Sequence, residues 1–280
     1  MRPHPPAVSL VRAVVRHLKA NGSPEHAAGV QGFFKEEVQS HGWYTADLRR
    51  YAKVLHTQLA ADQALLLDVA ERLFASPVLE EKALAVTMLE PSLSRFGNAE
   101  FRRFESWFGM VRSWADHDAL AMFLIGPLIV ADPRRAKRPI RWASSPSRWR
   151  RRGAAVSLIH GVRRGLFYEE ALAVAGRLLA DRDDMVQKGL GWLLREWAKH
   201  DPEAAVPVLM DIRTRASRLV LRTACEKLAP ALRARVLHPR GSRFGVRGSS
   251  ACLCCGGREA DHASKVGLQR MGSRTTRHDM

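Results

Sequence analysis

A tryptophan and an aspartate lie close together in residues 113–118, Ser-Trp-Ala-Asp-His-Asp. On one continuous helix Trp114 and Asp118, four residues apart, share a face. An indole beside a carboxylate forms a surface that is apolar at one end and anionic at the other, which suits a cationic group. Two structural alternatives stay open: Trp114 extends an apolar stripe that reaches Val111, or Asp116 or Asp118 caps the apolar helix that follows.

A second tryptophan of interest lies within residues 187–197. The spacing predicts a helix whose buried stripe is formed by Leu190, Leu193, Leu194 and Trp197. Trp192 then lies on the opposite face beside Lys188, Arg195 and Glu196, and an indole flanked by cations is typical of a nucleic-acid-binding face. Packing of Trp192 between adjacent helices is the alternative. Because Gly189 and Gly191 each weaken a helix by about 1 kcal/mol relative to Ala, we expect another group to approach the backbone there.

Positive charge is concentrated in two segments. The chain has 45 Lys and Arg against 28 Asp and Glu, a net charge of +17. Residues 134–152 hold nine basic residues and no acidic one, and residues 233–280 hold ten basic and three acidic ones, so the remainder is nearly neutral. Such blocks favour a polyanionic partner, most simply nucleic acid. Within the first block, Arg148, Arg151 and Arg152 are candidate phosphate-binding residues, since a bound anion would relieve their mutual repulsion. An arginine-rich coding bias is the alternative.

Helical periodicity extends over nearly every segment up to about residue 235, and no segment alternates with the period of a strand. Turn signals recur every 15 to 20 residues, as at 21–24, 97–98 and 201–202, so the helices pair into units of about 35 to 45 residues. We therefore expect an all-α fold: a curved right-handed stack of antiparallel helical hairpins of the HEAT-like type, an α-solenoid, over residues 1–237. An irregular helical bundle is the alternative. A concave face carrying the basic block would form a cradle for a DNA duplex.

Residues 238–280 are rich in Gly, Ser and Arg, which predicts a disordered tail. Cys252, Cys254 and Cys255, with His262, lack the paired spacing of a zinc site, so we expect no metal and no cofactor. The longest apolar stretch, residues 119–131, is shorter than the roughly 20 residues that span a bilayer, and no signal peptide is evident. No nucleotide-binding, hydrolase-elbow or zincin motif occurs. We therefore expect a cytoplasmic, nucleoid-associated protein without a membrane partner.

Together, residues 113–118, 148–152 and 187–197 resemble the DNA alkylation repair glycosylases with HEAT-like repeats, the AlkD type. The resemblance covers about residues 10–235 and is strongest at Trp149-Arg-Arg-Arg-Gly-Ala-Ala and at Gln187-Lys-Gly-Leu-Gly-Trp-Leu-Leu-Arg-Glu-Trp. It implies an enzyme that removes cationic N3- and N7-alkylated purines from double-stranded DNA as a monomer. The family's pocket residues fall on Trp114, Asp118 and Trp192, and its DNA-gripping arginine falls on Arg152. A pocket-edge tyrosine of the family falls on Phe33, which lacks the hydroxyl.

The implied chemistry suits these residue types. A cationic purine leaves without a general acid, and positive charge develops on the deoxyribose as in other glycoside hydrolyses. A fixed carboxylate stabilises that charge, and the loss of one such group lowers the rate by about 100- to 1,000-fold. Some members of the superfamily lack the aspartate and are not glycosylases. A non-catalytic helical-repeat module that binds DNA structures or proteins is therefore the alternative function.

Overall fold

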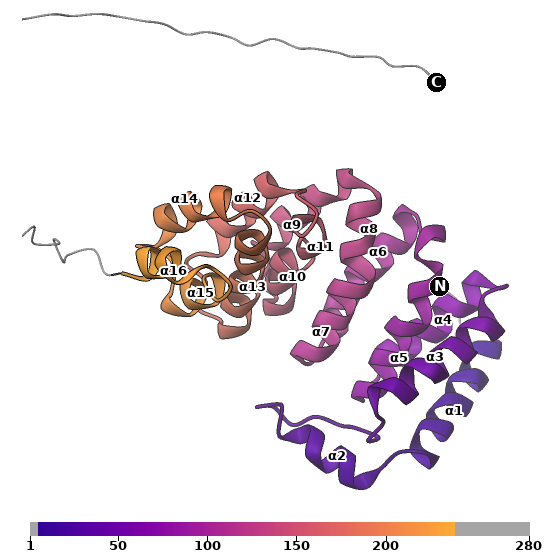
Figure 1. The fold of residues 1–280 in the computed structure, drawn as a ribbon. Coiled ribbons are helices and arrows are strands. Elements are labelled where there is room, and N and C mark those ends of the chain that lie inside the picture. The colour runs from indigo at the N-terminus through magenta and orange to yellow at the C-terminus, as the bar shows by residue number, and fades with distance from the viewer. Residues whose placement is uncertain (1–4, 239–280) are drawn as a thin grey trace, which may run out of the picture. The chain divides into compact units, whose positions relative to one another are not determined.

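The computed structural model describes residues 5–238 and contains no β-strand among them. Most of its helices are joined by short turns, as the sequence predicts, while residues 32–44 form a longer irregular segment between α2 and α3 (Figure 1). In the first half they are α1 (Pro5–Ala20), α2 (Pro24–Gln31), α3 (Thr45–Leu59), α4 (Gln63–Phe74), α5 (Leu79–Leu89), η1 (Glu90–Arg95), α6 (Asn98–Ser106), η2 (Trp107–Met110), α7 (Trp114–Leu120), η3 (Ala121–Ile125) and α8 (Gly126–Ala131). In the second half they are η4 (Pro133–Ala136), α9 (Lys137–Trp142), α10 (Arg148–Val156), α11 (Ile159–Val162), α12 (Tyr168–Leu178), α13 (Asp184–His200), α14 (Pro202–Ile212), α15 (Arg218–Ala224) and α16 (Pro230–Leu237).

Side chains at the predicted turns cap the first turns of the helices that follow. Ser23 caps α2 with Pro24 in its first turn, and Asp201 caps α14 with Pro202 in the same role. A short polar side chain accepts an N–H that the first turn leaves unpaired, and proline loses no hydrogen bond there. Neighbouring helices then pack on one another, α4 with α5, α9 with α10, and α10 and α15 on either side of α13. The all-α helical-repeat expectation is confirmed.

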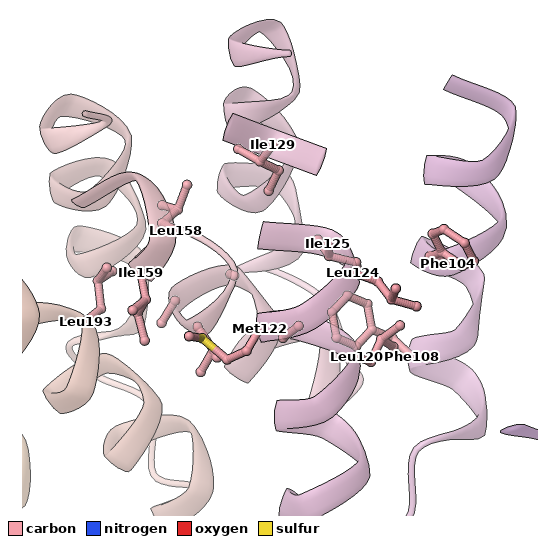
Figure 2. Packing of buried hydrophobic residues seen from close by; sticks show 14 of the residues in the cluster. Phe104, Phe108, Leu120, Met122, Leu124, Ile125, Ile129, Leu158, Ile159 and Leu193 are labelled. Carbon is pink, nitrogen blue, oxygen red and sulfur yellow. The ribbon is translucent and has the colours of Figure 1, made fainter. Parts of the chain in front are cut away.

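The apolar stretch predicted from residue 119 is part of a longer helical run. Trp114–Ala131 is continuous through α7, η3 and α8, with a π-helical turn just before Pro127. Figure 2 shows Leu120 and Leu124 on the side of Phe104 and Phe108. This run of 18 residues, with mean hydropathy 1.3, is by length and composition alone enough to cross a membrane, and 56% of it is buried inside the fold. The helical run is thus longer than the apolar stretch of residues 119–131 that the sequence analysis considered. Its buried side chains pack in the core, which accounts for its apolar composition.

The last described helix ends at Leu237, and the described residues end at His238. The predicted disordered tail, apart from its first residue, and the group of Cys252, Cys254, Cys255 and His262 lie outside the described residues.

Candidate functional site

The start of α7 fixes the position of Asp118. The chain is extended at Val111, so the apolar stripe that reaches this residue does not continue to Trp114. Ser113 caps α7, and Asp116 accepts hydrogen bonds from the backbone N–H groups of Arg112 (2.8 Å) and Ser113 (2.7 Å). Asp116 is therefore the capping carboxylate, a reciprocal arrangement common at helix starts. Asp118, two residues later, is left for another role.

A buried arginine on α10 holds Asp118. The Nε of Arg152 donates to Oδ1 of Asp118 (3.0 Å) and its Nη2 donates to Oδ2 (2.8 Å). Nδ1 of the buried His117 donates to the same Oδ1 at 2.7 Å. Oδ1 thus accepts two hydrogen bonds and Oδ2 one, while the Asp118 side chain stays 20% exposed. Since each carboxylate oxygen has two acceptor positions, Oδ2 can accept one more hydrogen bond or face a cation.

Both protonation states at the site follow from these neighbours. Burial acts to raise the pKa of Asp118, but the hydrogen bond from His117 and the charge of Arg152 outweigh it, so the pKa lies below its usual value. Burial lowers the pKa of His117 despite the nearby carboxylate. At neutral pH Asp118 is therefore an anion and His117 is neutral. Its one N–H is at Nδ1, facing the charged Oδ1, so the 3.1 Å contact of Nε2 with the Trp149 carbonyl oxygen is not a hydrogen bond.

Arg152 also joins α10 to α13. Its Nη1 donates to the carbonyl oxygen of Met185 (2.6 Å), and the side chain is buried. A Cβ on Gly189 would lie 3.1 Å from Cγ of Arg152, and one on Gly191 would lie 2.7 Å from Cβ of Thr223 on α15. The predicted close approach to both glycines is therefore made by the protein's own helices. All three donor nitrogens of Arg152 have partners, so the guanidinium predicted to grip phosphate is bound internally, and its phosphate role stays a prediction.

The exposed indole of Trp114 is covered from one side by a phenylalanine that the sequence reasoning missed. Phe34 stacks on Trp114 with ring centroids 5.1 Å apart and planes 17° from parallel. Its loop is held by Gln31, whose amide donates to the Glu36 carbonyl (2.9 Å) and accepts from the Val38 N–H (3.0 Å). Phe33, the expected pocket edge, is 77% exposed. Phe33 and Phe34 are consecutive residues of the same loop, so the only signal in the sequence for Phe34 was its position next to Phe33.

Trp192 lies on the face of α13 that carries the contacts with Arg152. Met185, Gly189 and Trp192 follow one another at helical spacing. The indole is half-buried against the core, and its Nε1 donates to Oε1 of Glu196 (3.1 Å), the acidic neighbour that the helical spacing predicts. The packing alternative is therefore partly right. The signal was present, because Glu196 stands four residues after Trp192 on the same helix face.

The predicted DNA-binding cations surround this region, and each has an acidic partner. The Nε of Arg148 lies 3.0 Å from Oδ2 of Asp183, and its Nη2 lies 3.7 Å from Oδ1 of Asp184. The Nε of Arg151 lies 2.6 Å from Oδ2 of Asp181. Lys188 pairs with Asp184 at 3.4 Å, and Arg195 pairs with Glu226 at 2.9 Å. These side chains are partly exposed, so their pairs are weak and can exchange for phosphate. The first half of the basic block, residues 134–141, lies on η4 and α9, and the second half lies on α10, so the block is divided between neighbouring helices. The single cradle expected for the whole block stays a prediction.

Comparisons with known proteins identify the family and the fold of the chain. The model of the family described as DNA alkylation repair enzyme matches residues 14–228. A structure described as a predicted DNA alkylation repair enzyme from Enterococcus faecalis is similar to this chain, with a TM-score of 0.69 and 18% identity, covering 75% of this chain and 97% of that one. A crystal structure from Streptococcus mutans UA159 gives a TM-score of 0.49 and 17% identity, covering 65% and 100%. No curated protein sequence matches the chain.

Proposed function

Because the chain belongs to the DNA alkylation repair enzyme family, which indicates a role in the repair of alkylated DNA, we propose that it is a DNA glycosylase. Its proposed substrates are the cationic N3- and N7-alkylated purines of duplex DNA, and its proposed reaction is hydrolysis of the N-glycosidic bond. The observation that carries the proposal is the ionised, partly exposed Asp118 held by Arg152 and His117 one helical turn from the exposed Trp114.

The proposed reaction needs a fixed negative charge more than it needs an acid. The alkylated base already carries positive charge, so it leaves without being protonated, and the developing charge is an oxocarbenium on the deoxyribose. Asp118 provides a carboxylate whose orientation is set by two donors of Arg152 and one of His117. Its Oδ2, with one acceptor position open, is the atom that would face the sugar and orient the attacking water.

The two indoles give the proposed site its selectivity for cationic bases. Trp114, supported by Phe34, presents a π-face beside Asp118, and such a face attracts a cation by about 0.5 to 2 kcal/mol. Trp192 presents a second half-buried indole on α13. A neutral base gains little from either ring and is a poor leaving group. Lys188 and Arg148 would hold the flanking phosphates, and we propose that the protein acts as a monomer in the cytoplasm, close to the nucleoid.

The direct test is release of free base from duplex DNA containing N7-methylguanine, followed by mass spectrometry of the liberated bases. We expect release by the wild-type chain and a rate about 100- to 1,000-fold lower for Asp118→Asn. Asp211→Asn is the matched control, since it removes a carboxylate that is largely exposed and paired only within α14 and the turn after it. Equal rates for wild type and Asp118→Asn would remove Asp118 from the mechanism.

The bidentate pair of Arg152 and Asp118 also favours a second candidate function, in which Asp118 is structural and the protein binds DNA structures without cleaving any bond. That function predicts duplex binding that weakens with salt, with log K falling by about 0.9 per phosphate contact, and no release of base from any alkylated duplex. Measuring binding and base release on the same duplex distinguishes the two functions.

A further inference from the structure

A second cationic pocket lies on elements that take no part in the Asp118 site. It has a volume of about 330 Å³ and is formed by α6, η4 and α9. Its lining residues are Asn98, Phe101, Arg102, Asp132, Arg134, Arg135 and Arg138. Four guanidinium groups thus converge on one cavity that has a single carboxylate in its wall.

Arg135 is built into the floor of this pocket. The residue is 9% exposed, its Nε donates to Asn98 Oδ1 (3.0 Å), and its Nη1 donates to the carbonyl oxygen of Leu128 (2.9 Å). Its guanidinium also lies 5.2 Å from the centre of the Phe101 ring. These partners are neutral and preserve the positive charge, and the nearest carboxylate, Asp132, stands 3.6 Å away. Burying a guanidinium with mainly neutral partners is costly, and an anion in the pocket would offset that cost.

The acidic groups at the pocket do not neutralise it. Asp132 is engaged by Arg134 through two hydrogen bonds (2.8 and 3.1 Å), and Glu105 takes Arg138. Arg102 is exposed and has no ion pair within residues 5–238. Four guanidinium groups against two carboxylates leave two positive charges in excess, and two further exposed cations, Lys137 and Arg141, lie on α9. A series of cations along two adjacent elements suits a polymer with one phosphate in each unit.

A buried aromatic row separates this pocket from the Asp118 site. Phe101 stacks on Trp142 (6.3 Å between centroids), Trp142 contacts Phe108 (5.5 Å), and Phe108 contacts His117 (5.6 Å). All four residues are buried, so core side chains lie between the pocket wall at Phe101 and His117, the neighbour of Asp118.

We propose that this pocket is a second phosphate-binding site, which takes the backbone of another nucleic-acid segment while the Asp118 site is free or occupied. Arginine favours phosphate because its planar fork donates two parallel hydrogen bonds to phosphate oxygens. The proposal does not rest on glycosylase activity, since the residues of the pocket include neither Asp118 nor its hydrogen-bond partners.

The test compares the full chain with Arg102→Glu/Arg134→Glu, and with Arg12→Glu/Arg16→Glu as the control. The control makes the same charge change at exposed positions of α1. The titrants are an unmodified 12-base-pair duplex, inorganic tripolyphosphate and oligoglutamate. We expect wild type and control to bind two duplexes per chain, and the pocket variant to bind one and lose at least tenfold in tripolyphosphate affinity.

Each other outcome overturns the proposal. Tripolyphosphate binding that depends on Arg102 and Arg134, with only one duplex bound to wild type, would assign the pocket to a free polyphosphate. Oligoglutamate binding that depends on Arg102 and Arg134, with only one duplex bound to wild type, would assign the pocket to an acidic protein segment. Equal behaviour of the two variants with every titrant would leave the pocket without a ligand. Base release from an alkylated duplex, measured in parallel, reports separately on the proposed function.

Discussion

Replacing Arg152 by Met should show that this arginine positions Asp118 and does not primarily grip DNA. The change keeps most of the aliphatic stem but removes two hydrogen bonds to Asp118 and one to the Met185 carbonyl oxygen. Removing one partner of a buried ion pair costs about 3 to 5 kcal/mol, because the other charge is left without compensation. Since the Asp118 side chain is 20% exposed, water can partly replace the guanidinium, and we expect a loss near the lower limit, about 3 kcal/mol.

The Asp118→Asn background separates the ion pair from the other contacts of Arg152. There the arginine no longer compensates a charge, so Arg152→Met removes mainly the hydrogen bond to Met185 and the packing of the head group, about 1 kcal/mol. The double-mutant cycle should therefore give a coupling energy of about 2 kcal/mol between residues 118 and 152.

Urea unfolding, followed by far-UV circular dichroism and tryptophan fluorescence, measures the four variants. A duplex-binding titration at several salt concentrations supplies the second readout. If Arg152 only positions Asp118, the slope of log K against log salt is unchanged in Arg152→Met. If Arg152 binds a phosphate directly, the substitution reduces the magnitude of that slope by about 0.9. A coupling energy near zero together with a reduced slope would refute the positioning role and restore the phosphate-binding role that the sequence predicts for Arg152.

Three further predictions concern packing, pH and the pocket edge. Gly191→Ala should destabilise the fold by about 1 kcal/mol or more, since the new Cβ would lie 2.7 Å from Cβ of Thr223. Gly176→Ala on α12 should instead stabilise the fold by up to about 1 kcal/mol, because a Cβ there would have nothing within 4 Å. The midpoints of urea unfolding of the two variants and wild type measure both effects. Burial lowers the pKa of His117 from 6.5, so below about pH 6.5 the unfolded chain binds a proton at this residue that the folded chain does not. The free energy of unfolding should therefore decrease as the pH decreases below about 6.5, by at most 1.4 kcal/mol per pH unit. His117→Asn should weaken this pH dependence, as measured by urea unfolding at several pH values. Phe34→Ala should lower the rate of base release several-fold because Trp114 loses its stacking partner; a larger loss for Phe33→Ala would show that Phe33 forms the pocket edge.

Local signals in the sequence correctly predicted the helices and two local features of the candidate site. The four-residue spacing of Trp114 and Asp118 requires a continuous helix, and α7 provides it. The two glycines of α13 indicated a close approach, which Arg152 and Thr223 make. Both inferences depend on a single helix, where spacing alone fixes which residues share a face.

Contacts between helices could not be predicted in this way. The pairing of Asp118 with Arg152 joins residues 34 positions apart, and nothing in either segment specifies the distance between α7 and α10. The basic block is a similar case. Its residues are adjacent in sequence, yet the turn at 144–147 divides them between α9 and α10, and only the fold brings Arg138 and Arg150 together on Glu105. Charge counted along a chain does not show where a fold exposes it.

The pairing of Asp118 also bears on how a carboxylate can function on a surface that binds DNA. An isolated anion would repel phosphates as well as attract a cationic base, since its field acts over the Debye length of about 10 Å. Arg152 compensates this charge, and the field of a close ion pair falls off more steeply with distance than that of a single charge. At contact the compensation is incomplete, because a cation about 4 Å from Oδ2 lies nearer to that oxygen than to the guanidinium. Two opposite unit charges at that separation attract by about 4 kcal/mol at an effective dielectric constant of about 20, and repulsion by the more distant guanidinium removes part of this attraction without cancelling it. The pair is therefore nearly neutral toward the DNA backbone and anionic toward a cation that reaches Oδ2, which is the discrimination that the proposed reaction requires.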